Sequence, residues 1–251
     1  MDDRTVFPGL LISVRNLSEA DSIACLGIEV LDLKEPSDGP LAPVRPELWG
    51  QVTACYAGKL TLSAALGEFE QAIDIAAKLP NSFSFAKAGP SNCASLDNLN
   101  ANWTTLREHL DREVRLVAVA YADHRAADCP SPMEIFKLAG QVGLKTWLLD
   151  TFVKDGRSTL DHVTMLELSD LAELAKANRA RWVLAGSMRL NTVKNFFRSG
   201  VKPSLFGVRG DVCDVTREGD ISPHKVQQWL TMLTNESRTQ TLRERLASGI
   251  D

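Results

Sequence analysis

In TWLLDTFVKDG, residues 146–156, a strand-like apolar run is followed by a lysine and a turn. The same arrangement occurs in VLDLKEP at residues 30–36 and in SFSFAKAG at residues 82–89. Short runs of this kind are typical of strands that are buried on both faces of a parallel sheet. The lysines that end the three runs are Lys34, Lys87 and Lys154.

Eight such runs alternate with helix-like segments along the chain. The predicted strands are residues 10–14, 29–33, 59–63, 82–87, 114–120, 145–150, 181–186 and 204–208. Apolar residues recur at helical spacing in segments 18–27, 68–79, 100–112, 131–143 and 168–180. Strict alternation predicts an α/β fold with a parallel sheet, and eight repeats predict one (β/α)8 barrel of the TIM type over residues 1–251.

Local signals add detail to this plan. Ser18 and Ser131 are each followed three residues later by an acidic residue, which predicts that they cap helix N-termini. Residues 36–50 are rich in Pro and Gly, so we expect a long loop over the barrel mouth. The polar segment from about residue 235 is predicted to be a frayed terminal helix.

Bulk properties exclude several classes of function. The formal net charge of −4 gives no field that would attract nucleic acid or an anionic membrane surface. We find no apolar stretch of membrane-spanning length, and the N-terminus predicts no signal peptide. Five cysteines without a CxxC pair favour a reduced, cytoplasmic protein, and four histidines without a ligand pattern indicate no metal site.

The three lysines point to amine chemistry. In an eight-stranded α/β barrel the active site lies at the C-terminal ends of the strands, and alternate strands supply one layer of inward side chains. Lys34, Lys87 and Lys154 end the second, fourth and sixth strands, so we expect them to face one pocket and to lower one another's pKa. Asp32 and Asp150 precede Lys34 and Lys154 and are interpreted as their partners in ion pairs or proton shuttles; surface salt bridges are the alternative.

The last two strands end in AGSM at residues 185–188 and in GVRGDVC at residues 207–213. In barrels that bind phosphorylated substrates, the loops at these places commonly hold the phosphate through backbone N–H groups. Glycine allows close approach of the anion, and an arginine adds a forked cation. The predicted phosphate ligands are Gly186, Ser187, Arg209 and Gly210.

Together these strings resemble one family, (5-formylfuran-3-yl)methyl phosphate synthase, which forms the furan of methanofuran-type cofactors. The matching strings are LLISV, DLKEPSDGPL, TLSAALG, FAKAG, VAYAD, LLDTFVKDGR, LAGSM and GVRGDVC, in order from about residue 10 to 213. The loop after Lys34 departs from the family, with KEPSDGPLA in place of an Asn-Pro and a Leu-Gly. The resemblance implies active-site roles for Asp32, Lys34, Lys87, Asp150 and Lys154.

The resemblance also implies a reaction. Two molecules of glyceraldehyde 3-phosphate would condense, without a cofactor, to a phosphorylated furan aldehyde with release of phosphate and water. One of the lysines, with Lys34 as the first candidate, would form an imine that activates a ketone, and Asp150 with Lys154 would interconvert the triose phosphates by proton transfer. The sequence leaves open which lysine forms the imine. The implied setting is the cytoplasm of a bacterium or archaeon that makes a methanofuran-like one-carbon carrier; homo-oligomer formation is left open.

Two other functions are consistent with the pattern. The D-x-K string suggests another sugar-phosphate lyase or a decarboxylase, although such decarboxylases need a further Asp where this chain has Ser37. The second alternative is a catalytically silent barrel that binds sugar phosphates. Borohydride trapping with a triose phosphate would separate these alternatives, because only an imine-forming enzyme becomes covalently labelled.

Overall fold

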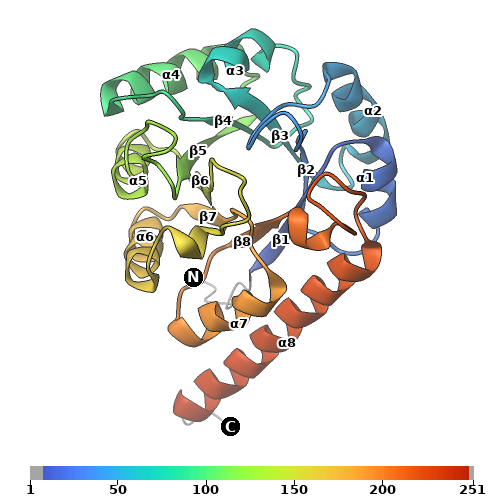
Figure 1. Ribbon diagram of the computed structural model, residues 1–251, viewed down its shortest axis with the longest axis vertical. Helices are drawn as coiled ribbons and strands as arrows, with labels where there is room; N and C mark the ends of the chain where they lie inside the picture. Colours follow the sequence, from blue (N-terminus) through green and yellow to red (C-terminus); the bar gives the residue numbers. More distant parts are fainter. Residues whose placement is uncertain (1–7, 249–251) are drawn as a thin grey trace.

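The computed structural model describes residues 8–248 and contains the closed parallel barrel that the sequence predicts (Figure 1). Each strand pairs in parallel with its neighbours in chain order, and the first strand pairs with the last. The strands are β1 (Gly9–Val14), β2 (Val30–Leu33), β3 (Thr61–Glu68), β4 (Phe85–Gly89), β5 (Arg115–Tyr121), β6 (Thr146–Asp150), β7 (Arg181–Leu184) and β8 (Leu205–Val208).

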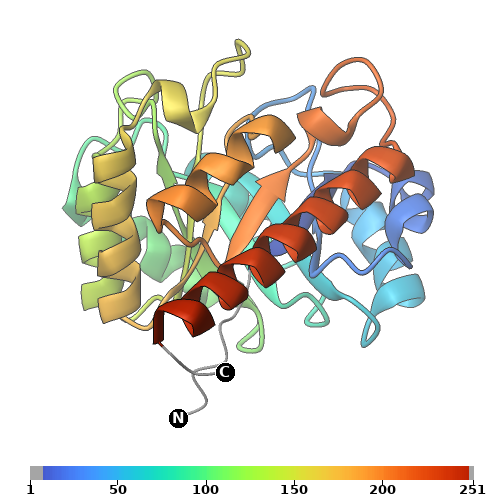
Figure 2. The ribbon, with the colours of Figure 1, turned by 90° about the horizontal axis from the view of Figure 1, so that it is seen from below.

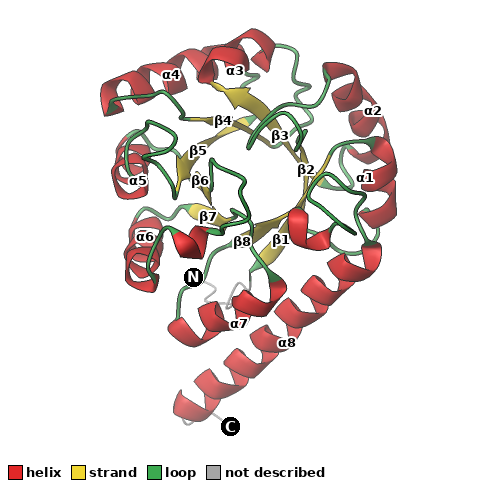
Figure 3. Cartoon of the chain, in the orientation of Figure 1, coloured by secondary structure: helices red, strands yellow, loops and turns green. Residues whose placement is uncertain are grey.

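Helices form a ring outside the strands (Figure 3). They are α1 (Leu17–Ile23), α2 (Pro46–Tyr56), α3 (Phe69–Ala76), α4 (Leu96–His109), α5 (Pro132–Gln141), α6 (Met165–Ala177), α7 (Leu190–Ser199) and α8 (Pro223–Ser248). Two short 3-10 helices, η1 (Thr159–Asp161) and η2 (Gly210–Val212), follow β6 and β8. As described, none of these helices is long and apolar enough to cross a membrane.

Several helix boundaries differ from the prediction. The N-cap of α1 is Asn16, whose side chain accepts a hydrogen bond from Glu19 N at 2.9 Å, so the assignment of this cap to Ser18 was wrong. Ser131 does form the predicted capping box with Glu134. The expected loop at 36–50 is shorter, because Pro46 starts α2 and proline suits the first position of a helix.

Two further predictions concern the ends of the chain. The segment from residue 235 is helical, as predicted, and continues α8 without a break as far as Ser248. The prediction that the N-terminus lacks a signal peptide falls largely on residues 1–7, which lie outside the described residues, as do residues 249–251 of the tail.

The C-terminal ends of β3 and β7 differ from those predicted from the sequence. β3 runs on to Glu68, past the predicted end at residue 63, with an irregular register between Ala65 and Glu68. β7 stops at Leu184, because the chain enters the left-handed region at Gly186 (φ +83°) and Ser187 (φ +52°). A turn of this kind lifts the backbone out of the sheet at the barrel mouth.

The barrel interior is layered, as the two-residue period of the strands requires. An apolar layer of buried side chains lies in its lower part and consists of Leu11, Val30, Phe85, Val117, Leu148, Val183 and Leu205. One step nearer the C-terminal ends, the inward side chains become polar. This upper layer includes Ser13, Asp32, Ser63, Lys87 and Asp150, all of them buried.

Two loops stand above the barrel mouth in the side view, the yellow one after β6 and the orange one after β8 (Figure 2). The β8 loop is closed by a bridge between Cys213 and Ile221 and by a hydrogen bond from Asp214 N to Asp220 O at 3.0 Å. Both loops start at the C-terminal ends of strands, so they border whatever occupies the mouth.

Candidate active site

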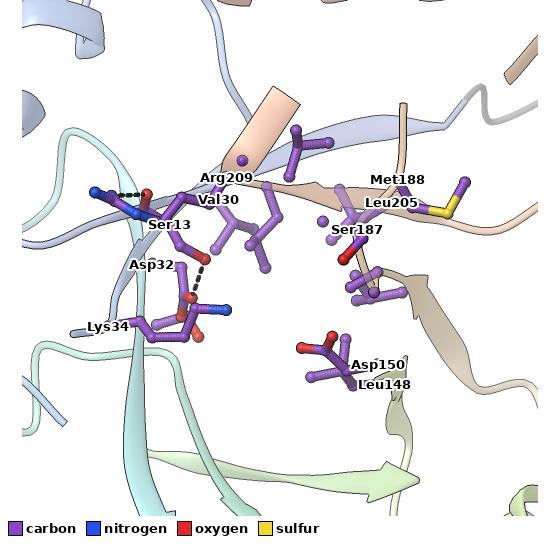
Figure 4. A pocket seen from close by; sticks show the side chains of 18 of the residues that line it. Ser13, Val30, Asp32, Lys34, Leu148, Asp150, Ser187, Met188, Leu205 and Arg209 are labelled. Atoms are coloured by element: carbon purple, nitrogen blue, oxygen red, sulfur yellow. Dashed lines mark hydrogen bonds between the residues drawn. The ribbon is translucent and has the colours of Figure 1, made fainter. Parts of the chain in front are cut away.

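A cavity of about 460 Å³ opens at the C-terminal ends of the strands. The apolar layer lines its deeper part, which extends to Thr146 and Arg181 at the N-terminal ends of β6 and β7. The walls include all five residues that the sequence analysis placed in the active site. Lys34 extends into the cavity from the β2 side, and Asp150 lies across from it at the end of β6 (Figure 4). The three strand-end lysines therefore meet in one cavity, as expected from their places on alternate strands.

Asp32 pairs with a different lysine from the one expected. Its carboxylate forms a buried ion pair with Lys87 of β4 and accepts a hydrogen bond from Ser13 Oγ at 2.8 Å. Lys87 Nζ also donates to Ser63 Oγ at 3.3 Å. The expected Asp32–Lys34 pair is therefore wrong, because the Lys87 side chain crosses the small residues of β3 and takes the carboxylate.

Asp150 and Lys154 form the second ion pair. Lys154 Nζ lies 2.7 Å from Asp150 Oδ1 and 3.0 Å from Thr151 Oγ1, and Thr151 N donates to the same carboxylate at 2.7 Å. Burial alone would raise the pKa of Asp150. The charges of Lys154 and Lys34 and the two hydrogen bonds outweigh burial and hold its pKa at about 2. Asp150 is thus a carboxylate at any physiological pH.

Lys34 is the amine without a carboxylate of its own. No side chain in the described part of the protein accepts a hydrogen bond from its Nζ, and the residue is only 8% exposed. Burial lowers its pKa; Asp150 and Asp32 raise it, whereas Lys154 and Lys87 lower it further, and the balance is about 8. A free amine is therefore accessible near neutral pH, which nucleophilic attack on a carbonyl requires.

The turn after β7 presents backbone donors to the cavity. Thr159 of η1 braces this turn, with its Oγ1 donating to Ala185 O at 2.6 Å and its N–H to Gly186 O at 2.9 Å. A Cβ at Gly186 would lie 2.9 Å from Thr151 N, so only glycine fits there. The N–H groups of Gly186, Ser187 and Gly210 donate to no described residue, and all three residues line the cavity.

Arg209 does not present its side chain to a phosphate. All five N–H groups of its guanidinium are engaged: two with the Glu19 carboxylate at 2.8 and 3.0 Å, and three with the carbonyls of Ser13, Arg217 and Gly219. The side chain points back toward β1 and reaches the Ser13 carbonyl (Figure 4). The expected role as a forked phosphate ligand is therefore corrected: Arg209 holds α1, β1 and the β8 loop together.

The sequence analysis missed several polar residues of the cavity, among them Ser13, Ser63 and Arg217. Ser13 and Ser63 are polar residues at inward positions of otherwise apolar strands, a signal that the strand pattern already contained. Arg217 lies in the β8 loop and lines the cavity. The sequence indicated only that this loop follows the last strand and so borders the active site. Ser37, where a decarboxylase would need an Asp, is exposed and donates to Glu35 Oε1 at 2.6 Å.

These features define the class of the protein: an α/β-barrel enzyme with lysines and carboxylates convergent in one cavity at the strand C-termini. Among the described residues, His, Cys, Asp and Glu side chains do not gather into a group of metal-ligand type. A metal ion would therefore have no ready set of protein ligands in the part of the chain that is described.

Comparison with known proteins identifies the family. A profile described as 4-HFC-P synthase matches residues 10–230, so the chain belongs to this family. The (5-formylfuran-3-yl)methyl phosphate synthase of Methanosarcina mazei is 28% identical over 227 residues, which cover 87% of this chain and 96% of that protein. The protein of the same name from Methanothermobacter thermautotrophicus is 28% identical over 211 residues, 81% of this chain and 89% of its own.

Solved structures confirm the fold. KGPDC from Streptococcus mutans has a TM-score of 0.62 at 12% identity, covering 91% of this chain and 98% of its own. Phosphoribosyl anthranilate isomerase from Thermococcus kodakaraensis has a TM-score of 0.59 at 16% identity, covering 91% and 99%. At such low identity the similarity concerns the barrel and not the reaction.

Proposed function

We propose that this enzyme makes (5-formylfuran-3-yl)methyl phosphate from two molecules of glyceraldehyde 3-phosphate. Family membership supports the product, because relatives over nearly the whole chain carry that name. The observation that carries the proposal is the pairing of a buried amine of low pKa, Lys34, with the Asp150–Lys154 ion pair in one cavity. Imine formation and proton transfer are the two kinds of chemistry that this reaction needs.

The first step is proton transfer on the aldose. The Asp150–Lys154 pair removes the proton from C2, which gives an enediol. Return of a proton at C1 produces the ketone, dihydroxyacetone phosphate. Loss of phosphate from C3 produces instead an enol whose terminal carbon is nucleophilic. The Asp150–Lys154 pair thus prepares both reaction partners from the same enediol. Atoms and electrons balance in both reactions of the enediol.

The second step joins the two trioses. The Lys34 amine attacks the ketone carbon, water leaves, and a protonated imine forms. The terminal carbon of the enol attacks this carbon, a new C–C bond forms, and the C=N electron pair returns to nitrogen. The imine carbon is the better electrophile because its nitrogen already carries the positive charge.

Ring closure completes the furan. The C1 hydroxyl of the former ketose attacks the carbonyl next to the aldehyde, a second water leaves, and the Lys34 amine departs as protons are lost and the ring becomes aromatic. Two trioses therefore give one furan, one phosphate and two waters, and Lys34 is regenerated. All bonds break and form heterolytically, so no oxidant or reductant enters the balance.

The other polar groups have supporting roles in this proposal. The buried Asp32–Lys87 pair lies beside Lys34, and its ammonium can protonate the hydroxyl groups that leave as water. The free N–H groups of Gly186, Ser187 and Gly210 hold the phosphate of the imine-bound triose, a site that barrels of this class commonly use. The product would enter a methanofuran-like carrier in the cytoplasm.

Borohydride trapping combined with furan detection tests the proposal. With triose phosphates and borohydride, the wild-type protein should gain one covalently bound triose, located by mass spectrometry on Lys34. Lys34→Arg keeps the charge but cannot form an imine, so it should lose both trapping and furan formation. Lys145→Arg, at the opposite end of β6, is the matched control and should keep both.

A second variant separates the two roles. Lys154→Ala should lose the interconversion of the triose phosphates yet still be trapped when dihydroxyacetone phosphate is supplied. If Lys154→Ala abolishes trapping and Lys34→Arg does not, the imine belongs to Lys154. If the wild-type protein is neither trapped nor forms an ultraviolet-absorbing furan aldehyde, the proposed function is wrong.

A further inference from the structure

The β8 loop, residues 213–222, carries an arginine whose chemistry the proposed reaction has not used. Arg217 lines the cavity and is half-buried. Its main chain is held in place, because Arg209 Nε donates to Arg217 O at 2.7 Å and Arg209 in turn is fixed by Glu19. A charged side chain on an anchored loop at the mouth is suited to bind a ligand and not merely to be solvated.

The Arg217 guanidinium has most of its hydrogen bonds to spare. Among the described residues, its only acceptor is Gly39 O, at 3.5 Å, which is a weak contact. Gly210 lies directly beneath, since a Cβ there would be 3.4 Å from Arg217 Cβ. The side chain therefore spans from the β8 end of the mouth toward the loop after β2, above the cavity.

The other cations of the cavity are differently placed. Lys87 and Lys154 are neutralised by Asp32 and Asp150 in close pairs. Arg189 is exposed and donates to Gly156 O at 3.1 Å. Arg181 pairs with Glu29, and Lys34, which also has free donors, forms the imine in the proposed reaction. Arg217 is therefore the remaining cation of the described lining that has free donors and is partly withdrawn from water. Burial lowers its pKa, and the charge of Asp150 opposes that effect.

The proposed reaction brings two phosphoryl groups into this cavity. The backbone donors at Gly186, Ser187 and Gly210 can hold one of them. The second phosphate carries nearly two negative charges, and burying it without a cation would be costly. In the proposed chemistry it is also the group that leaves, so its charge grows as the C–O bond breaks, and a cation placed there stabilises the transition state.

We propose that Arg217 binds the phosphate of the triose that does not form the imine, and so forms a second phosphate site at the mouth. This inference rests on the proposed function for the identity of the triose. In this arrangement the aldose lies between the Asp150–Lys154 pair, which takes its C2 proton, and Arg217, which receives its departing phosphate. The forked guanidinium can hold two phosphate oxygens at once, which lysine cannot do.

Two measurements on Arg217→Gln test this site. The first is calorimetric titration with inorganic phosphate, which needs no catalysis: the wild-type protein should bind two phosphates and Arg217→Gln one. Arg157→Gln is the matched control, because Arg157 lies in the neighbouring β6 loop, is exposed, and pairs with Asp155 outside the cavity. It removes the same charge from the same end of the barrel and should still bind two.

The second measurement separates the two trioses. Arg217→Gln should keep borohydride trapping of dihydroxyacetone phosphate on Lys34, but form furan roughly 10- to 100-fold more slowly when both trioses are supplied. Arg217→Lys should recover part of the rate. Unchanged furan formation with two phosphates still bound would overturn the inference, and so would a wild-type protein that binds only one phosphate.

The outcomes for this inference and for the proposed function can be told apart. Absence of trapping and furan in the wild-type protein contradicts the proposed function, whereas the phosphate stoichiometry still decides the role of Arg217. Loss of dihydroxyacetone phosphate trapping in a folded Arg217→Gln would assign Arg217 to the imine-forming triose and would overturn the assignment made here.

Discussion

At the scale of single residues, Lys34 differs from Lys87 and Lys154 in having no carboxylate partner of its own among the described residues. Asp32 is held by Lys87, and Asp150 is held by Lys154. Both carboxylates still act on Lys34 at longer range and keep its pKa from falling below about 8. The two ion pairs thus supply charge to the site and leave one lysine free to become a neutral nucleophile.

This difference predicts the pH dependence of imine formation. The attacking species is the neutral amine, so trapping of dihydroxyacetone phosphate should rise with pH to a midpoint near 8 and fall about tenfold per pH unit below it. Asp150, with a pKa of about 2, stays ionised throughout this range and adds no acidic limb. Initial trapping rates between pH 6 and 9 measure the midpoint.

Substitutions of Lys154 and Asp150 test the direction in which each charge shifts the pKa of Lys34. Lys154→Met removes a like charge and should move the midpoint up, whereas Asp150→Asn removes an attractive charge and should move it down. A midpoint near 10.5, the ordinary value for lysine, would contradict the burial of this amine. A downward shift in Lys154→Met or an upward shift in Asp150→Asn would contradict the described ion-pair arrangement.

At the scale of elements, the buried Glu19–Arg209 pair joins the first turn of α1 to the end of β8. Both side chains are almost fully withdrawn from solvent, and Arg209 also fixes the carbonyls of Ser13 and Arg217. Arg209 thus links β1 with the β8 loop. β1 carries Ser13, which donates to Asp32, and the loop carries Arg217. Two walls of the cavity depend on this contact.

Breaking this pair should destabilise the fold. Arg209→Met leaves the buried Glu19 carboxylate with Arg15, 3.1 Å away, as its remaining cationic partner among the described residues, and should lower the free energy of unfolding by up to about 3–5 kcal/mol in urea titrations. The double variant Glu19→Met/Arg209→Met removes both charges and should recover part of that loss. Arg209→Met of unchanged stability but with a raised KM would instead support the direct phosphate contact expected from the sequence.

At the scale of the whole molecule, the site is expected to reduce stability. Lys34 has a folded pKa of about 8 against an ordinary value of 10.5, so the folded state disfavours its charged form. At pH 7 the amine is mostly protonated in both states, and the folded protein carries the full cost of the buried charge. That cost shrinks as pH rises from about 8 toward 10.5, where both states lose the proton.

Lys34→Met should therefore raise the free energy of unfolding at pH 7, on the order of 1–3 kcal/mol, while abolishing trapping. The gain should be smaller at pH 9.5. Lys137→Met, which replaces an exposed lysine of α5, controls for the change of residue type and should have little effect at either pH. Denaturant titrations at the two pH values give the comparison, and a gain that is independent of pH would show that packing and not charge is responsible.

The barrel, its strand order and the meeting of three lysines in one cavity could be predicted from the amino-acid sequence. Apolar runs of strand length in strict alternation with helical segments permit few other folds. A lysine at the C-terminal end of such a run must lie at the mouth, because all strands of a parallel barrel point the same way. These properties depend on local pattern and chain order alone.

Which charged side chains form ion pairs could not be predicted from the sequence, because it depends on the tertiary structure. The register pairs Asp32 with Ser63 and Ser63 with Phe85, so Lys87, two residues further along β4, can reach back across β3 to Asp32. Arg209 forms an ion pair with Glu19, which is distant in sequence, and Arg217 lines the cavity at its mouth. The ion-pair partners of a side chain depend on the stagger between strands and on distances across a closed barrel. Neither can be derived from the local sequence pattern.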